Sequence, residues 1–405
     1  MTKIMNDWIV PLLFLVLPFV FLAPGLIWKS QLLFFLICPV FIIALDIKNI
    51  WIKSFLLYAS AWQIVVFFLS FSKVGMNPGY GLSVILALMA GAIVFKFVSE
   101  GNIPDEKWFT VIRIAVILQI LLSLPQPFGW NPFADFMALF IKVRENLPGH
   151  LVGSLGNRNY LAAFIAISIP CFVGWRTFKA RGISINPAII GIFVFLGFCL
   201  SPGTLAAIIG MAFLLSYNLS PMKRLISMSA AMKVAVAFTA CYVLITGNHL
   251  NEFTALPGQL HEFLTTGKFT VDPFKSDVGR FAMWMMALSQ LITGWFFMIF
   301  GFGPGAFWGR EYSMHGQYIS VWFQFGLVGL GLMAGYIYTT IRFLAKRKSL
   351  ILLTSFVIIC LDMIGNFPAE IASTAFLIIV ICGLIERERT IPLHCKGEGE
   401  WKQPL

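Results

Sequence analysis

The run YISVWFQFGLVGLGLMAGYIYTTI occupies residues 318–341 and contains no charged side chain. Its 24 residues exceed the roughly 20 that an α-helix needs to cross a hydrocarbon core about 30 Å thick. A basic cluster follows at once and comprises Arg342, Lys346, Arg347 and Lys348. Because cytoplasmic loops of membrane proteins are enriched in Lys and Arg, the run predicts a transmembrane helix that ends in the cytoplasm.

The composition extends this interpretation to the whole chain. Hydrophobic residues make up 59% of the 405 residues, charged residues make up 12%, and the mean hydropathy is +0.86. Soluble domains carry about a quarter charged residues, so the sequence predicts an integral membrane protein. Helices are expected, because the alternating pattern of a membrane β-barrel is absent. The apolar run at 8–28 is too long for the core of a secretory signal, and we expect it to remain as the first transmembrane helix.

Apolar runs and basic clusters together predict an all-α fold, with twelve transmembrane helices in one polytopic domain at 1–405. The predicted helices cover residues 8–28, 31–45, 54–71, 80–98, 108–124, 159–175, 187–200, 204–217, 234–247, 318–341, 350–364 and 371–385. A cytoplasmic N-terminus places the Lys and Arg clusters between them on the cytoplasmic side. Both termini are therefore predicted in the cytoplasm, with long external segments at 125–158 and 248–317.

Each external segment contains an apolar stretch. Residues 132–146 have apolar side chains at helical spacing, which predicts an amphipathic helix at the membrane interface. Residues 281–300 are apolar enough to cross the membrane, but a crossing there would place the basic cluster at 342–348 outside. We therefore expect 281–300 to lie along the outer leaflet or to dip into it.

Several functional classes are disfavoured. Six of the seven cysteines lie inside apolar runs, and no CxxC or HExxH motif occurs, so neither a disulfide framework nor a metal site is indicated. None of the five histidines lies in a predicted transmembrane helix, which argues against haem held between facing helices. The net charge of +11 is spread over short loops and reflects topology rather than nucleic acid binding. The sequence predicts neither a metal nor a cofactor.

Arg158 stands between Asn157 and Asn159 at the start of a predicted transmembrane helix, on the external side. A guanidinium beside the free amides of a helix N-terminus forms a site for an oxyanion. Other external cations, such as Lys142 and Lys268, are expected to contact lipid phosphates or solvent. The position of Arg158 therefore predicts an anion-binding role.

Two further arginines flank a glycine-rich stretch. Arg280 precedes Gly301-Phe302-Gly303-Pro304-Gly305, and Arg310 follows it. Glycines allow a backbone to approach a ligand closely, although the stretch is also consistent with a flexible surface turn. If the loops converge, the guanidiniums of Arg158, Arg280 and Arg310 would suit a pyrophosphate, whose oxygens accept bidentate hydrogen bonds.

His315 lies three residues before the transmembrane run that begins at Tyr318. A lone histidine in a loop is ordinarily structural or solvated. No serine triad or acidic metal cluster competes with it in the sequence, and histidine is the side chain that titrates near neutral pH. His315 is therefore a candidate general base.

At these residues the chain resembles the superfamily of O-antigen ligases and O-antigen polymerases, which are glycosyltransferases of the bacterial envelope. The resemblance covers residues 150–385, and residues 1–150 agree only in hydropathy. It rests on GSLGNRNYLA at 153–162, Arg280 with Trp284, GFGPGAF at 301–307, His315 with Tyr318, GLVG at 326–329 and NFP at 366–368. The chain departs from the family pattern at Gly316, where asparagine is common, at Gln324, where an acid is common, and at Pro202, where arginine is common.

The resemblance implies an active site on the periplasmic side of the bacterial inner membrane, in the long loop between the ninth and tenth helices. The implied donor is a glycan on undecaprenyl pyrophosphate, and the acceptor is a lipid A core or another glycan. His315 would deprotonate the acceptor hydroxyl, which would attack the anomeric carbon with inversion and without a metal. The resemblance assigns the pyrophosphate to Arg158, Arg280 and Arg310, and further substrate contacts to Asn157, Asn159 and Tyr318.

Three functions remain open at this point. The motifs look most like the ligase branch, whose members transfer the glycan to a core acceptor. A polymerase of the same superfamily would add it to a second lipid-linked chain. A lipid-linked glycan flippase would also have many helices, but the link at 176–186 is short and few ionisable residues fall inside the predicted helices. The expected partners are the donor, the acceptor and membrane lipids, without nucleic acid.

Overall fold

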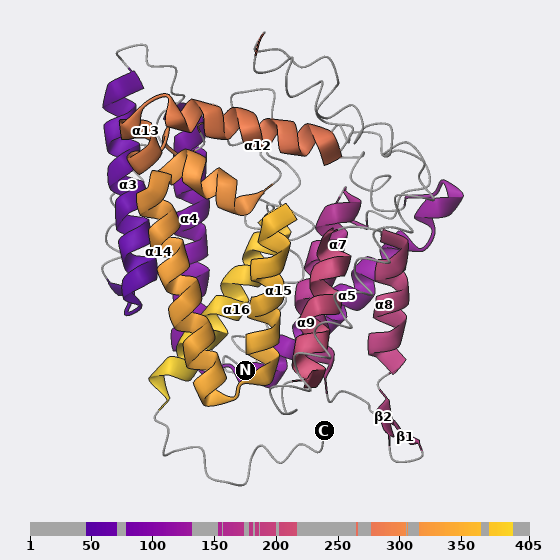
Figure 1. Cartoon of the computed structure of the whole chain (residues 1–405). Coiled ribbons are helices and arrows are strands. Elements are labelled where there is room, and N and C mark those ends of the chain that lie inside the picture. The colour runs from indigo at the N-terminus through magenta and orange to yellow at the C-terminus, as the bar shows by residue number, and fades with distance from the viewer. Residues whose placement is uncertain are drawn as a thin grey trace.

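A computed structural model describes residues 46–70, 78–131, 153–155, 157–173, 178–180, 183–185, 187–199, 202–216, 265, 277–304, 306, 316–365 and 372–391. This part of the chain is mostly helical (Figure 1). Its helices are α3 Ile50–Ser70, α4 Pro78–Glu100, α5 Asp105–Ser123, η2 Gln126–Phe128, α7 Arg158–Ser168, η3 Ile169–Phe172, α8 Pro187–Cys199, α9 Pro202–Ser216, α12 Asp277–Ile292, α13 Trp295–Phe300, α14 Gln317–Arg347, α15 Leu350–Gly365 and α16 Ala372–Thr390.

Nine of the twelve predicted transmembrane segments coincide with these helices to within six residues at either end, when α7 and η3 are taken together. The predicted segments 8–28, 31–45 and 234–247 and the amphipathic stretch 132–146 lie outside the described residues. Among the described helices, Asp105–Phe128 and Gln317–Arg347 are long and apolar enough to cross a membrane. The helical fold class is confirmed, and association with a membrane is supported by these two helices.

The outward face of α5 is apolar. Ile114, Ile117, Leu121 and Leu124 are exposed at intervals of three or four residues, and Phe128 beyond the helix is 88% exposed. Residues at that spacing share one side of a helix. In a soluble protein this stripe would be a core face, whereas here it faces away from the core. A hydrocarbon environment accounts for it.

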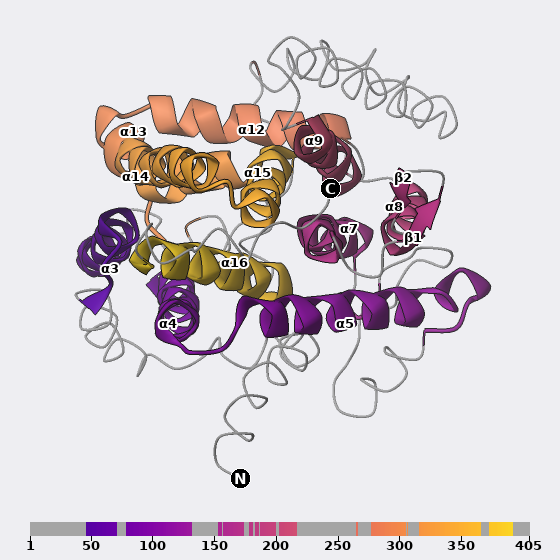
Figure 2. The same cartoon turned by 90° about the horizontal axis from the view of Figure 1, so that it is seen from below.

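The core lies where α4, α7, α9, α15 and α16 meet. Seen along the helices, α15 lies between α14 and α9, and α16 lies between α15 and α4 (Figure 2). Small residues allow the closest crossings: a Cβ at Gly383 would lie 2.7 Å from Val98 Cβ, and one at Gly210 would lie 2.3 Å from Ile358 Cγ1. Such contacts are typical of helices that pack in membranes, where small residues let backbones approach.

A two-stranded antiparallel sheet departs from the all-α prediction. Strand β1 covers Phe178–Ala180 and strand β2 covers Ile183–Ile185, with Ala180 opposite Ile183. Two residues, Arg181 and Gly182, separate the paired positions, and a two-residue connection containing glycine is typical of a hairpin. The hairpin is a small addition to a fold whose other described elements are all helical.

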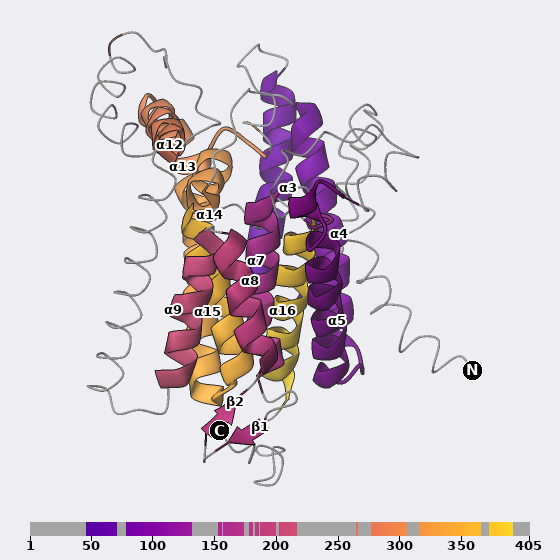
Figure 3. The ribbon, with the colours of Figure 1, turned by 90° about the vertical axis from the view of Figure 1, so that its right-hand side faces the viewer.

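The helix α12 runs across the ends of the other helices rather than along them (Figures 1 and 3). The apolar segment 281–300 is divided between α12 and α13, with a break at Thr293 and Gly294. It is therefore not one continuous helix along the bundle. This arrangement agrees with the expectation, based on the charges at 342–348, that the segment lies along a membrane surface.

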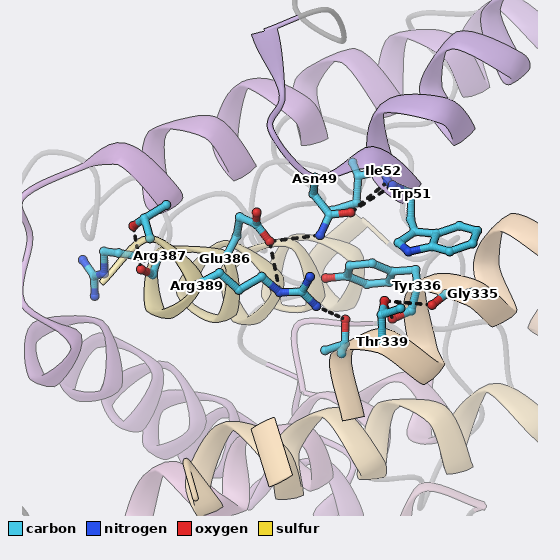
Figure 4. A network of polar contacts seen from close by, with 11 residues as sticks. Asn49, Trp51, Ile52, Gly335, Tyr336, Thr339, Glu386, Arg387 and Arg389 are labelled. Carbon is cyan, nitrogen blue, oxygen red and sulfur yellow. Dashed lines mark hydrogen bonds and ion pairs between the residues drawn. The ribbon is translucent and has the colours of Figure 1, made fainter. Parts of the chain in front are cut away.

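At the opposite end of the bundle, the last turns of α16 form a buried polar network (Figure 4). Glu386 Oε2 accepts a hydrogen bond from Asn49 Nδ2 at 3.0 Å and lies 3.4 Å from Arg389 Nε. Arg389 Nη2 in turn donates to Thr340 Oγ1 of α14 at 3.0 Å. Asn49 also caps α3, because its Oδ1 accepts from the Trp51 amide at 3.1 Å. Glu386 and Arg389 together thus link α16 to the start of α3 and to α14.

Replacing Glu386 with alanine is expected to lower the free energy of unfolding by about 1–3 kcal/mol, because it leaves the partly buried Arg389 guanidinium and the Asn49 amide without their acceptor. The measurement is thermal unfolding in detergent, followed by size-exclusion chromatography. The exposed Lys346 on α14 provides a matched control, and its replacement by alanine should change stability by less than about 0.5 kcal/mol. Equal stabilities for the two variants would contradict a structural role for the network.

Candidate active site

The segment Asn157–Asn159 forms the start of α7. Asn157 is the N-cap residue, and its side-chain oxygen accepts a hydrogen bond from the Asn159 amide at 2.8 Å. Asparagine is favoured there because its carbonyl satisfies an amide that has no partner within the helix. The expectation that the first-turn amides are free for an anion is therefore wrong for Asn159. The structure describes Arg158 by its backbone position as the first residue of α7.

Replacing Asn157 with alanine is expected to lower the free energy of unfolding by about 1 kcal/mol, through loss of the cap. Asn157→Asp keeps an oxygen that caps the helix and adds a negative charge beside Arg158. We expect that variant to be as stable as the parent and to bind an anionic ligand more weakly. Thermal unfolding and titration with inorganic pyrophosphate separate the two effects, and a stable Asn157→Ala variant would contradict the capping role.

Two glutamines of the α5 region hold the segment that precedes Arg158. Gln119 donates to Ser154 Oγ at 2.6 Å and accepts from the Ser154 amide at 3.0 Å. Gln126 donates to the Gly153 carbonyl and accepts from the Gly153 amide, both at 2.9 Å. Sequence reasoning missed both residues. The available signal was an amide side chain, Gln119, within residues 114–122, which are otherwise apolar, since such groups in membranes bind neighbouring segments.

The start of α14 contacts α12. A Cβ added to Gly316 would lie 3.1 Å from the indole of Trp284, so the backbone just after His315 rests against that ring. Trp284 follows Arg280 by four residues in α12, and residues at this spacing share one face of a helix. Gly316, the residue after His315, therefore packs against the face of α12 to which position 280 also belongs. The same contact explains the departure at Gly316, because Trp284 occupies the side where a Cβ would be.

The glycine-rich stretch docks on an interruption in α14. Gly326 has φ 65° and ψ −168°, which divides α14 into 317–325 and 327–347. The Phe302 amide donates to the Phe323 carbonyl at 2.8 Å, and the Gly303 amide donates to the Gln324 carbonyl at 2.9 Å. These two carbonyls belong to the last turn before the break. In a continuous helix they would accept hydrogen bonds from amides four residues later in α14, and here amides of the glycine-rich stretch donate to them. The stretch is therefore a structural support of α14, which favours an ordered role over a flexible turn.

The first segment of α14 also contacts α15. The Tyr318 hydroxyl donates to the Cys360 carbonyl at 2.9 Å, so this side chain joins the two helices. Gln324 Nε2 donates to Ser320 Oγ at 2.9 Å, and both side chains are buried. A neutral amide at Gln324 avoids the cost of burying a carboxylate at this position. The role of Tyr318 in binding substrate stays a prediction beside its structural one.

The predicted site residues group at one end of the bundle as far as the structure describes them. The first turn of α7, the helix α12 and the first segment of α14 all lie at this end (Figures 1 and 3). Arg158 and Arg280 are described by their backbone positions. His315 and Arg310 lie outside the described residues, and His315 immediately precedes Gly316. Asn157, Asn159 and Tyr318 are described in full.

No model of a known protein family and no curated protein matches the chain. Its function therefore has to be argued from its own residues and from their arrangement.

Proposed function

We propose that this protein is an O-antigen ligase-like glycosyltransferase with twelve transmembrane helices. It would transfer a glycan from undecaprenyl pyrophosphate to a hydroxyl of a lipid A core or similar acceptor, at the periplasmic face of the inner membrane. The observation that carries this proposal is the contact of Gly316, the neighbour of His315, with Trp284, which lies one helical turn from Arg280 in α12. The helix that begins with Arg158 starts at the same end of the bundle.

The mechanism follows from the chemistry of these groups. His315 in its neutral form takes the proton of the acceptor hydroxyl, and the acceptor oxygen forms a bond to the anomeric carbon. The bond from that carbon to the pyrophosphate oxygen breaks, and its electron pair leaves with undecaprenyl pyrophosphate. Arg158, Arg280 and Arg310 stabilise the charge that develops on the leaving group. Direct displacement of this kind inverts the anomeric configuration.

The depth of the site in a bilayer supports a lipid-linked donor. Phe128 is 88% exposed and Trp130 is 61% exposed, at the end of the apolar stripe of α5. Aromatic side chains concentrate at the headgroup level of membranes. Gln126 lies in the same turn and binds Gly153, so the chain leading to Arg158 is held to this turn, which supports a site at the headgroup level. A pyrophosphate attached to a membrane lipid would lie at the same depth.

The contacts at the other end favour an enzyme over a flippase. Arg387 of α16 pairs with Asp105 of α5 and donates to the Ile103 carbonyl. Burial lowers the pKa of Arg387, and the neighbouring carboxylate of Glu388 opposes that shift. Glu388 itself accepts from Ser349 Oγ ahead of α15. A carrier opens alternately to both sides, and opening here would break these partly buried charged contacts between α16 and its neighbours.

Reconstitution of the purified protein in liposomes tests the proposed function. The assay supplies a defined undecaprenyl-pyrophosphate glycan and a defined acceptor, and it follows glycan transfer together with release of undecaprenyl pyrophosphate. Transfer without movement of donor across the bilayer supports the glycosyltransferase. Movement of intact donor to the opposite leaflet without transfer would overturn the proposal in favour of a flippase.

A deletion strain separates the ligase from the polymerase. The motifs at 301–307, His315 and 366–368 support the ligase branch. Loss of the ligase removes all long glycan chains from the lipid A core, whereas loss of a polymerase leaves a band with a single repeat unit. The banding pattern of lipopolysaccharide on a gel distinguishes the two outcomes.

A further inference from the structure

The interruption of α14 leaves a third carbonyl that the glycine-rich stretch does not bind. Phe325 is the last residue before Gly326, and its carbonyl would accept from residue 329 in a continuous helix. Phe300 ends α13, and its carbonyl lies near the same place. The next residue, Gly301, packs so closely against α14 that an added Cβ would lie 2.4 Å from the Gln324 carbonyl oxygen. Away from water, a backbone carbonyl without a donor is costly. A donor from elsewhere in the fold would satisfy both carbonyls.

Tyr58 of α3 supplies that donor. Its hydroxyl lies 2.9 Å from the Phe300 carbonyl and 2.9 Å from the Phe325 carbonyl. A tyrosine hydroxyl carries one proton, so the two carbonyls share it. These acceptors are 242 and 267 residues away along the chain. One side chain therefore joins the end of α13 and the break in α14 to a different helix.

An aromatic cluster holds Tyr58 in place. Trp62, one turn further along α3, has its ring centre 5.7 Å from those of Phe296 and Phe300, and Tyr58 packs in the same cluster. The glycine-rich stretch also packs closely against α3: a Cβ added to Gly303 would lie only 2.5 Å from Val66 Cγ2. Close contacts of α3 with α13 and with the glycine-rich stretch therefore hold the Tyr58 hydroxyl in position.

We infer that Tyr58 is a positioning residue for the first segment of α14, and that its bond to the Phe325 carbonyl fixes the end of that segment at the break. The catalytic consequence rests on the proposed function, because His315 immediately precedes this segment. Tyr58 touches neither donor nor acceptor in this scheme. It acts through the Phe325 carbonyl on the direction of 317–325, and so on the distance between the imidazole and the acceptor hydroxyl.

The test replaces Tyr58 with phenylalanine, which keeps the ring and removes the hydroxyl. Tyr338→Phe is the matched control, since Tyr338 lies in the second segment of α14 and is 63% exposed. Hydrogen exchange of the peptides that cover 296–303 and 317–330 reports the position of the segment without any assay of activity. We expect faster exchange in these peptides for Tyr58→Phe, an unchanged rate in 350–365, and no change for Tyr338→Phe.

Kinetics with the reconstituted protein give the second readout. A misplaced base is expected to lower kcat by about 10-fold to 100-fold, with little change in KM for the donor. The decrease in kcat as the pH falls through about 6.5 should also be smaller in Tyr58→Phe than in the parent protein, because less of the remaining reaction depends on histidine. A merely structural effect would scale the whole pH profile without changing its shape.

The outcomes separate the two proposals. Unchanged exchange and unchanged kinetics in Tyr58→Phe would overturn the positioning role while leaving the glycosyltransferase intact. If Tyr58→Phe exchanges faster but the parent protein transfers no glycan, Tyr58 keeps its role in positioning α14 and the proposed glycosyltransferase is wrong. A pH profile that is scaled without change of shape would reduce Tyr58 to a structural residue.

Discussion

Replacing His315 with alanine is expected to reduce glycan transfer by about 10²-fold to 10⁴-fold, the contribution typical of a positioned general base. The acceptor hydroxyl is a weak nucleophile, whereas the pyrophosphate leaves readily and needs no proton. Loss of the base should therefore lower kcat, while binding of the donor by the arginines is retained. The measurement is transfer in liposomes, together with binding of the donor by the same variant.

The pH profile of the parent protein provides an independent check on this role. Histidine must be neutral to accept a proton, so the rate should fall as the pH drops through the histidine pKa, which is ordinarily about 6.5. His315→Ala should lose that dependence. His261→Ala, in the same external segment, is the control and should transfer at the parental rate. Full activity in His315→Ala would remove the histidine from the mechanism.

The positions of most described helices could be predicted from the sequence because hydropathy depends on composition within a short window. The interruption at Gly326 could not, and the run 318–341 was predicted as one continuous helix. Such a break is stabilised by donors far away in the chain, including Tyr58 and the amide of Phe302. Glycines occur also at 329, 331 and 335 in the same helix, so the residue type alone does not mark the position.

The candidate site was predictable in its residue types and less so in its contacts. Asn157 and Asn159 were expected to frame an anion site, but the cap between them depends on backbone angles that spacing does not reveal. The contact of Gly316 with Trp284 joins two residues that are 32 positions apart in the chain, and no local pattern predicts it. The first turn of α7, the helix α12 and the first segment of α14 lie at one end of the bundle, whereas the side of the membrane that this end faces stays a prediction. The convergence of the guanidinium groups stays a prediction.

Gly326→Ala is expected to lower the free energy of unfolding by more than about 4 kcal/mol and to abolish transfer. The backbone there has φ 65° and ψ −168°, a region that is essentially restricted to glycine. A Cβ would also lie 2.1 Å from the Ile299 carbonyl oxygen and 2.5 Å from the Phe300 amide nitrogen. Both neighbours are backbone atoms of α13, so no change of side-chain rotamer relieves the overlap.

The control for this variant is Gly331→Ala in the second segment of α14, where no atom lies within 4 Å of an added Cβ. An alanine there should stabilise the helix by about 0.5–1 kcal/mol, since glycine is unfavourable inside helices. Thermal unfolding in detergent therefore distinguishes two states of α14. If the helix were continuous through Gly326, both alanines would be stabilising. If the break exists, the two variants shift the unfolding temperature in opposite directions, because only Gly326 meets the backbone of α13.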